Sequence, residues 1–383
     1  MTGFRFLHAS DLHLGKAFAR YPEPARGRLV DARHGAIARL TDAARARDIG
    51  HVLLAGDTFD SETPSERVVR QALDAFAAAD GLVWWLLPGN HDSLAAEALW
   101  DRLRGALPGN VRLADRPAPA ALAPGVALLP APVPRRQPGR DPTAWMDAAA
   151  TPADTRRLGL AHGPVVDFST AAEAPGTIAP DRPRRAGLAY LALGDWHGAL
   201  TVGPAAAYSG APERDGFRHA GRGTCLAVTL RGEGAAPEIE TVRTGVFDWA
   251  EIALTLTPGD AAAALVTTAL EGGAARRDRL RRLTLGGRVG MAARRAMAAA
   301  VDKAAPAFCH LESDWQDLST DRAPEDLDAI AAAGALRAAA EALAAEADDD
   351  PDGETRAVAA AALNRLYGMV AAEGADAAAA GEG

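Results

Sequence analysis

The chain has 383 residues, of which 48% are hydrophobic and 24% charged, so it can bury a full core. Its two cysteines exclude a disulfide framework and a four-cysteine zinc site. The formal net charge is −9, so binding to nucleic acid would require a local basic face or a metal site. Residues 1–8 contain no secretory signal pattern and no stretch is long enough to span a membrane, so we expect a soluble cytoplasmic protein.

Apolar strands alternate with amphipathic helices through the first part of the chain, which is typical of an α/β domain. In chain order we expect a strand at 4–8, a helix at 26–47, a strand at 51–55, a helix at 63–79 and a strand at 82–87. Segment 104–155 is rich in Pro, Ala and Arg, and only 126–129 in it reads as a strand, with a long loop at 130–151.

Regular strands return after that segment, and the pattern then changes. The further strands are expected at 158–161, 188–193, 225–230 and 239–242. Residues 251–303 alternate strand, helix, strand and helix, which indicates a small α+β module, and the chain is helix-forming from 323 onward. We therefore expect three parts, namely residues 1–245, 246–320 and 321–383.

Five short motifs each follow one of the expected strands. They are Asp11-Leu-His13, Gly56-Asp57, Gly89-Asn-His-Asp92, His162-Gly163 and Gly194-Asp-Trp-His197. Loops past the carboxyl ends of strands are where sites assemble in α/β proteins, and mixed nitrogen and oxygen donors suit Mn, Fe or Zn. Taken singly, each motif is more often a turn or a satisfied polar residue. Taken together, in this order, they favour a binuclear metal site.

The order of the five motifs resembles that of the calcineurin-like metallophosphoesterase superfamily. Within it, the segments 4–15, 55–60 and 190–194 are similar to SbcD/YhaO-type DNA repair exonucleases. The resemblance covers about residues 4–245. It implies a sandwich of two mixed sheets with helices outside (αββα), followed by a small α+β capping module and a helical tail.

The resemblance also implies a role for each motif residue. Asp11, His13, Asp57 and His197 would hold the first of two divalent metal ions. Asp57 would bridge to the second ion, which Asn90, His162 and Asp195 would also hold. His91 would not be a ligand but would face the phosphate as a general acid, and Asp92 would orient His91 or brace its loop. The ions are expected to be manganese, with magnesium, iron or zinc as alternatives.

Position 195 departs from the family pattern, which has histidine where this chain has Asp195. A third carboxylate beside Asp11 and Asp57 adds negative charge and a hard oxygen donor, which favours Mn or Mg. It should also make an attacking water less acidic. We expect activity to survive with a higher pH optimum.

DNA as the substrate, with 3′-to-5′ exonuclease and single-strand endonuclease activity, follows from the resemblance. Three arginine groups are candidate phosphate contacts, each of them equally well explained as a solvated surface: 135, 136 and 140; 182, 184 and 185; and 276, 277, 279, 281 and 282. Trp196 is open to three interpretations, namely packing, a wall of the site or a base-stacking platform. The resemblance further implies that the helical tail docks on an SMC-like coiled-coil ATPase and that the protein forms a homodimer.

Two other functions stay open at this point. One is a metallophosphodiesterase acting on small molecules such as cyclic nucleotides, and the other is a metal-bound scaffold that regulates an ATPase. The additional module and the tail favour a DNA nuclease over the small-molecule enzyme. The full set of candidate ligands argues against a pure scaffold.

Overall fold

The computed structural model describes residues 3–165, 176–232, 234–271, 275–321, 334–349 and 354–381, together with 326, 328 and 330. The chain divides into two compact units, residues 1–249 and 250–383. The described part contains no helix that is both long and apolar enough to cross a membrane.

The first unit contains two six-stranded mixed sheets. In spatial order the first sheet has β12 (Glu238–Arg243), β11 (Thr224–Leu230), β1 (Phe4–Ala9), β2 (His51–Leu54), β3 (Val83–Leu86) and β4 (Val111–Leu113). The second sheet has β5 (Ala120–Ala123), β6 (Val126–Ala131), β7 (Arg156–His162), β8 (Leu188–Gly194), β10 (Ala206–Ser209) and β9 (Ala199–Gly203). This is the two-sheet α/β sandwich that the sequence predicts.

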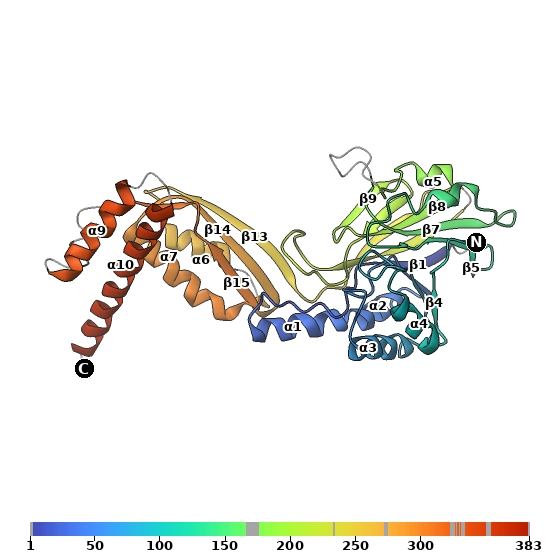
Figure 1. The fold of residues 1–383 in the computed structure, drawn as a ribbon, viewed down its shortest axis with the longest axis horizontal. Helices are drawn as coiled ribbons and strands as arrows, with labels where there is room; N and C mark the ends of the chain where they lie inside the picture. The colour runs from blue at the N-terminus through green and yellow to red at the C-terminus, as the bar shows by residue number, and fades with distance from the viewer. Residues whose placement is uncertain are drawn as a thin grey trace. The chain divides into compact units, whose positions relative to one another are not determined.

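Helices cover the outer faces of the two sheets, as Figure 1 shows for α2 to α4 on one side and α5 on the other. The helices of this unit are α1 (Glu23–His34), α2 (Ala36–Arg45), α3 (Glu66–Ala77), α4 (Glu97–Ala106) and α5 (Arg182–Arg185), with the 3-10 helix η1 at Ala144–Ala148. Three apolar clusters separate these layers, one between the sheets and one behind each sheet.

Successive side chains of a strand point to opposite faces of the sheet, so each strand contributes side chains to the apolar clusters on both of its faces. Phe6 and Trp85 belong to the cluster between the sheets, whereas their neighbours Leu7 and Trp84 pack with the helices behind the first sheet. Trp84 and Trp85 are therefore packing residues on opposite faces of the sheet.

The site motifs all lie beyond the carboxyl ends of parallel strands. In the first sheet β1, β2 and β3 run parallel, and in the second sheet β7 and β8 do. Residues 11–13, 56–57 and 89–92 follow the first three strands, while His162 ends β7 and Asp195 follows β8. The topology thus collects five separate stretches of sequence at one edge of the sandwich.

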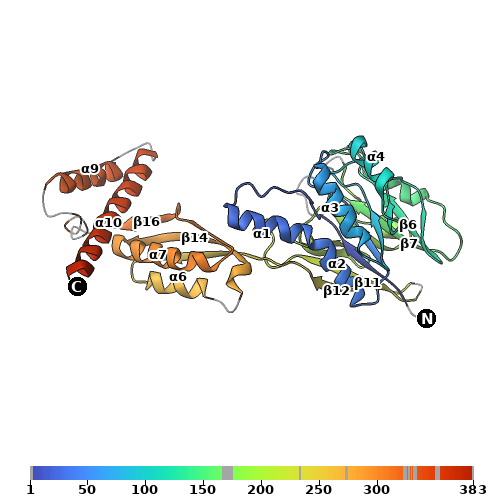
Figure 2. The ribbon, with the colours of Figure 1, turned by 90° about the horizontal axis from the view of Figure 1, so that it is seen from below.

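The second unit is a smaller sheet with helices packed on it. The sheet contains β13 (Asp248–Leu256), β14 (Arg279–Gly290), β15 (His310–Asp314) and β16 (Leu318–Asp321), and β13 begins just before the division at residue 249. Helices α6 (Ala262–Leu270) and α7 (Met291–Ala304) lie side by side on it (Figure 2), with short 3-10 helices η3 (Arg276–Asp278) and η4 (Ala305–Ala307). Helices α9 (Ala335–Asp349) and α10 (Glu354–Gly381) pack against each other and against Met291.

Two expectations about local structure were wrong. The single helix expected over 26–47 is two helices, because the backbone turns at Gly35 between α1 and α2. The stretch around the expected loop 130–151 is also more ordered than its composition suggests, since β6 continues to Ala131 and η1 follows at 144–148. Of the expected helical tail, residues 322–325, 327, 329, 331–333, 350–353, 382 and 383 lie outside the described residues.

Candidate metal centre

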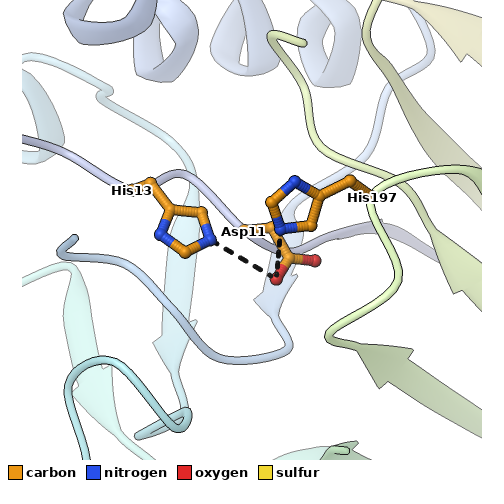
Figure 3. A group of neighbouring side chains, drawn as sticks. All are labelled: Asp11, His13 and His197. Atoms are coloured by element: carbon orange, nitrogen blue, oxygen red, sulfur yellow. Dashed lines mark ion pairs between the residues drawn. The ribbon is translucent and has the colours of Figure 1, made fainter. Parts of the chain in front are cut away.

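Asp11, His13 and His197 form the first group of possible ligands (Figure 3). Asp11 and His13 lie on the loop after β1, and His197 lies on the loop after β8. Asp11 Oδ1 is 3.9 Å from His13 Nε2 and 3.8 Å from His197 Nε2. The loops of two different sheets therefore direct these three polar groups at a common point.

Asp57 connects this group to a second one, which contains Asp11, Asp57 and His162. Its Oδ2 atom lies 3.5 Å from His13 Nε2 and also 3.5 Å from His162 Nε2. All of these side chains except His197 are almost completely buried. The position of Asp57 between the two groups is the one that a bridging carboxylate would need.

Each of the three histidines has its Nδ1 atom next to an oxygen atom that lies outside the two groups described above. The oxygen belongs to the Ala55 carbonyl for His162 (2.8 Å), the Asp215 carboxylate for His197 (3.2 Å) and the Asp60 carboxylate for His13 (3.1 Å). For His162 and His197 this partner holds the proton on Nδ1 and leaves the Nε2 lone pair free, which is how metal-binding histidines are usually held, whereas Nδ1 of His13 forms no hydrogen bond among the described residues.

The inward atoms are suited to a cation. The Nε2 atoms of His13 and His162 and the Oδ1 atom of Asn90 are buried and have no hydrogen-bond partner among the described residues. Buried polar atoms without partners are costly, so their presence here points to a ligand. Two donors that share a cation at about 2.1 Å lie about 3–4 Å apart, which the observed separations match.

Asn90 and Asp195 complete the second group. Asn90 Nδ2 donates a hydrogen bond to Asp195 Oδ1 at 3.2 Å, and this Asp195 oxygen lies 3.8 Å from His162 Nε2. The contact orients the amide so that its oxygen, and not its nitrogen, is free. The aspartate at position 195 thus occupies the place expected of a ligand.

His91 lies beside these groups, with its ring centre 4.7 Å from that of His13. Its Nδ1 donates to the Asp60 carbonyl at 2.9 Å, and its backbone N–H donates to Asp57. His91 also forms a third group with His13 and Asp60 that has the spacing of metal ligands.

Asp92 braces the loop rather than orienting the His91 ring. Its two carboxylate oxygens accept hydrogen bonds from the backbone N–H groups of Gly89 (2.7 Å) and Phe59 (3.0 Å). Burial, together with the charge of Asp57, raises the pKa of Asp92 to about 7. Of the two roles expected for Asp92, these contacts match the brace.

The backbone of the ligand loops is strained. Asp11, His13, Asp57 and Asp195 all have positive φ angles, of 57°, 42°, 54° and 101°. Such conformations are costly for residues other than glycine and gather at functional sites. Gly89 is required for a different reason, since a Cβ there would lie 2.1 Å from Asp57 Oδ1.

The carboxylates give the cluster a negative field. Burial alone would lower the pKa of His162, but the charges of Asp57, Asp11 and Asp195 raise it well above its ordinary value. Burial raises the pKa of Asp195, and the neighbouring Asp11 and Asp57 raise it further. Both directions show that an added positive charge would stabilise the cluster.

Two supporting residues were missed in the sequence analysis. Asp215 contacts both His197 and Lys16, whose Nζ lies 2.7 Å from Asp215 Oδ2. Asp60 faces His13. Asp60 stands three residues after Asp57 in a segment that was noted only for its family resemblance, and nothing around Asp215 in the sequence links it to His197.

One group of arginines expected as possible phosphate contacts is occupied by structural ion pairs. Arg182 is buried and pairs with Asp141 (2.7 Å) and Asp147. Arg184 pairs with Asp181 at 2.8 Å, and Arg185 pairs with Asp147. Of the two interpretations left open for this group, these ion pairs favour a structural role over phosphate contact.

Part of the chain is similar to a known protein family. Residues 4–137 match the calcineurin-like phosphoesterase family. The matched stretch contains Asp11, His13, Asp57, Asn90 and His91, and phosphoester hydrolysis with divalent metals is the chemistry that this donor set suits. His162, Asp195 and His197 lie beyond the match, and the structure brings them to the same place.

A curated relative is YhaO of Bacillus subtilis (strain 168), which is described as an uncharacterized metallophosphoesterase. It is 30% identical over 103 residues, which are 25% of this chain and 25% of that protein. The alignment thus spans a quarter of the relative's length. Among solved structures, TT1561 of Thermus thermophilus is similar over 63% of this chain and 100% of its own, with 11% identity and a TM-score of 0.39.

Proposed function

We propose that this chain is a metal-dependent phosphodiesterase that acts on DNA ends as a repair exonuclease. The observation that carries the phosphodiesterase part is the arrangement of three imidazoles around Asp11 and Asp57, each with Nδ1 near an oxygen and Nε2 facing the carboxylates. The DNA part is supported by the resemblance of the motif segments to the SbcD/YhaO-type exonucleases.

The donor set divides into two metal positions that share Asp57. His13, His197 and Asp11 would serve one position, and His162, Asn90 and Asp195 the other. When bound, two divalent ions, manganese first among the candidates, would polarise the phosphoryl oxygens and lower the pKa of the attacking water.

His91 would act on the leaving group. Its Nδ1 is engaged with the Asp60 carbonyl, so Nε2 is the nitrogen that can meet a phosphate oxygen. As an imidazolium it would donate the Nε2 proton to the leaving oxygen, a contribution worth about 10²–10⁴ in rate. Asp92 would hold the His91 loop against the loop of Phe59 through the two backbone hydrogen bonds.

The test is hydrolysis of end-labelled duplex and single-stranded DNA, and of bis-p-nitrophenyl phosphate, by wild type and by His91→Ala with Mn or Mg. We expect both substrates to be cleaved by wild type and turnover to fall about 10²–10⁴-fold in the variant with metal content unchanged. His34→Ala is the matched control. His34 is a half-buried histidine at the end of α1 that belongs to none of the possible ligand groups among the described residues.

The possible outcomes separate the two parts of the proposal. Cleavage of the small ester with intact DNA would replace DNA by a small-molecule substrate, or would point to a nuclease that needs a partner. Loss of metal from His91→Ala would contradict the role given to His91.

For the second unit, we propose a partner of the SMC-like coiled-coil ATPase type docking on α9 and α10, and a homodimer of this chain. Leu336, Val358 and Met369 on these helices are 50%, 64% and 58% exposed, which supports an apolar docking face. Co-purification with such an ATPase, lost in Val358→Asp, is the expected result. Light scattering of the purified chain tests the dimer.

A further inference from the structure

Trp196 is held in place beside the metal centre by a guanidinium group and an imidazole ring. It lies between Asp195 and His197 in the chain and packs against the apolar cluster behind the second sheet. The Arg218 guanidinium lies over the indole ring, with Cζ 5.1 Å from the ring centre. His219 meets the same ring edge-on, with ring centres 4.7 Å apart.

Arg218 occupies a ring face that a nucleobase would need for stacking. Trp196 therefore supports Arg218, which favours this role over that of a base-stacking platform. Arg218 itself is exposed, and no described residue forms an ion pair with it. An arginine laid on an aromatic ring is pre-organised, so it loses little freedom when its remaining N–H groups bind a phosphate.

Arg214, in the same loop, is a second cation, which lies in the field of Asp215 and Glu213 but has two nitrogen atoms without a hydrogen bond. Its side chain is nine-tenths buried, at 6% exposure, yet Nε and Nη1 have no hydrogen-bond partner among the described residues. Its neighbour in the chain, Asp215, contacts His197. Unpaired buried N–H groups are costly, and an anion would relieve that cost.

His219 is electrically neutral in this setting. Burial and the charges of Arg214 and Arg218 lower its pKa to about 4. The positive charge beside the metal centre is therefore carried by the two arginines. Arg214 and Arg218 thus place two guanidinium groups near the ligand loops of a chain with a net charge of −9, in a loop that also contains Glu213 and Asp215.

We propose that Arg218, supported by Trp196 and accompanied by Arg214, binds a phosphate next to the scissile one in a nucleic acid strand. The inference rests on the proposed function, because it places the scissile phosphate at the metal centre. It makes the loop 214–219 the part that distinguishes a polynucleotide from a substrate with a single phosphate.

The experiment compares a single-stranded oligonucleotide with bis-p-nitrophenyl phosphate, which has only one phosphate. We expect Arg218→Ala to raise KM for the oligonucleotide roughly tenfold, leaving its kcat and both constants for the small ester unchanged. The salt dependence of oligonucleotide binding should fall by about one unit of slope. Arg218→Lys should recover only part of the loss, because an ammonium does not lie flat on the indole ring.

Arg231→Ala is the matched control. Arg231 is exposed and pairs with Glu238, and it follows β11 where that strand lies against Phe4, at the opposite end of β1 from Asp11. We expect this variant to match wild type on both substrates.

Two results would overturn the inference, namely an equal loss on both substrates and an unchanged oligonucleotide KM. Anisotropy of the labelled oligonucleotide in EDTA keeps the test separate from the proposed function, since it needs no cleavage. Weaker binding by Arg218→Ala than by wild type supports the inference even if wild type leaves DNA intact, and equal binding contradicts it.

Discussion

The two units of the chain use their polar side chains in different ways. In the first unit, buried histidines and aspartates gather with unpaired atoms and positive φ angles. In the described part of the second unit, no group has the spacing of metal ligands. Its charged residues pair near the surface instead, as Arg282 does with Glu251 at 2.6 Å.

The contrast shows that the features which lower stability, namely strained backbone and unpaired buried atoms, gather in the ligand loops of the first unit. Strained backbone and buried polar atoms without partners persist only where the surrounding structure holds them, and they are typical of functional sites. The second unit has an apolar core of Leu, Val and Met side chains, with no ligand-like group among its described residues. We therefore expect the chemistry to be a property of the first unit, and the predictions below test that separation.

The largest effect is expected from Leu283→Ala in the core of the second unit. Leu283 is fully buried on β14, so its truncation should destabilise that unit by about 2–5 kcal/mol. Hydrogen exchange of β14 should rise while the metal affinity of the first unit stays the same. Val358→Ala, at a 64% exposed position, should change stability by less than about 0.5 kcal/mol. Loss of metal binding in Leu283→Ala would show that the units are not separable.

Asp215→Asn tests the support of the metal ligands. The carboxylate accepts from His197 Nδ1 and is itself paired with Lys16, so its charge fixes the ring. We expect metal affinity to fall about 10–100-fold, measured by titration with Mn²⁺. Asp115→Asn, which removes only the surface partner of Arg104, should leave the affinity unchanged. An unaltered affinity in Asp215→Asn would contradict the assignment.

His8→Gln tests a buried histidine of the first unit that stands outside the ligand groups. His8 Nε2 donates to the Leu193 carbonyl and Nδ1 accepts from the Tyr190 hydroxyl, which fixes the neutral form. Burial lowers the pKa of His8 from 6.5 to about 3.

Below about pH 6.5 His8 therefore binds a proton in the unfolded state but stays neutral in the folded state. The free energy of unfolding consequently falls as the pH drops. Between pH 7.5 and pH 5 this costs about 2 kcal/mol. Between pH 7.5 and pH 5, the free energy of unfolding of His8→Gln should therefore fall by about 2 kcal/mol less than that of wild type, as measured by urea unfolding at the two pH values. Parallel losses in both proteins would be the contrary result.

The smallest effect is expected from Asp195→His. The substitution removes the third carboxylate beside Asp11 and Asp57 and installs the residue that the family pattern has. With less negative charge the attacking water becomes more acidic, so the pH optimum should fall by up to about one unit. Metal preference should move from Mn or Mg toward Zn. An unchanged pH profile and metal preference would argue against a ligand role for Asp195.

The sequence was informative where local pattern and topology agree. Apolar runs ending in Asp, His or Asn predicted the strands and their loops, because a strand end in an α/β sheet is where a polar side chain can reach a site. The two-sheet fold followed from the resemblance and is confirmed by the strand order. The break at Gly35 was not predicted, since glycine alone does not end a helix.

Short and Ala-rich elements escaped the sequence analysis for physical reasons. The strands β9 and β10 have five and four residues, so the alternation of Leu200 and Val202 with Thr201 in β9 is too short to predict a strand. The strand β14 runs through Gly286 and Gly287, residues that more often mark the end of a strand or a bulge. The chain continues as a strand there because Gly287, with φ of 95°, lets the backbone pass Leu256, where a Cβ would lie 2.1 Å from its carbonyl oxygen.

Contacts between loops that are distant in the chain could not be predicted from the sequence pattern. Asp215 reaches His197 across 18 residues without any motif, and Arg218 reaches Trp196 in the same way. Such pairs depend on how loops from different strands approach each other, which periodicity does not encode.

The most direct test of the account is the metal stoichiometry of wild type and Asp57→Asn. Equilibrium dialysis against Mn²⁺, followed by elemental analysis, should find two ions per chain in wild type. Asp57 lies 3.5 Å from the Nε2 atoms of both His13 and His162, so its replacement should weaken both positions and leave at most one ion bound. Wild type without bound metal, or Asp57→Asn with two ions at unchanged affinity, would contradict a shared binuclear centre.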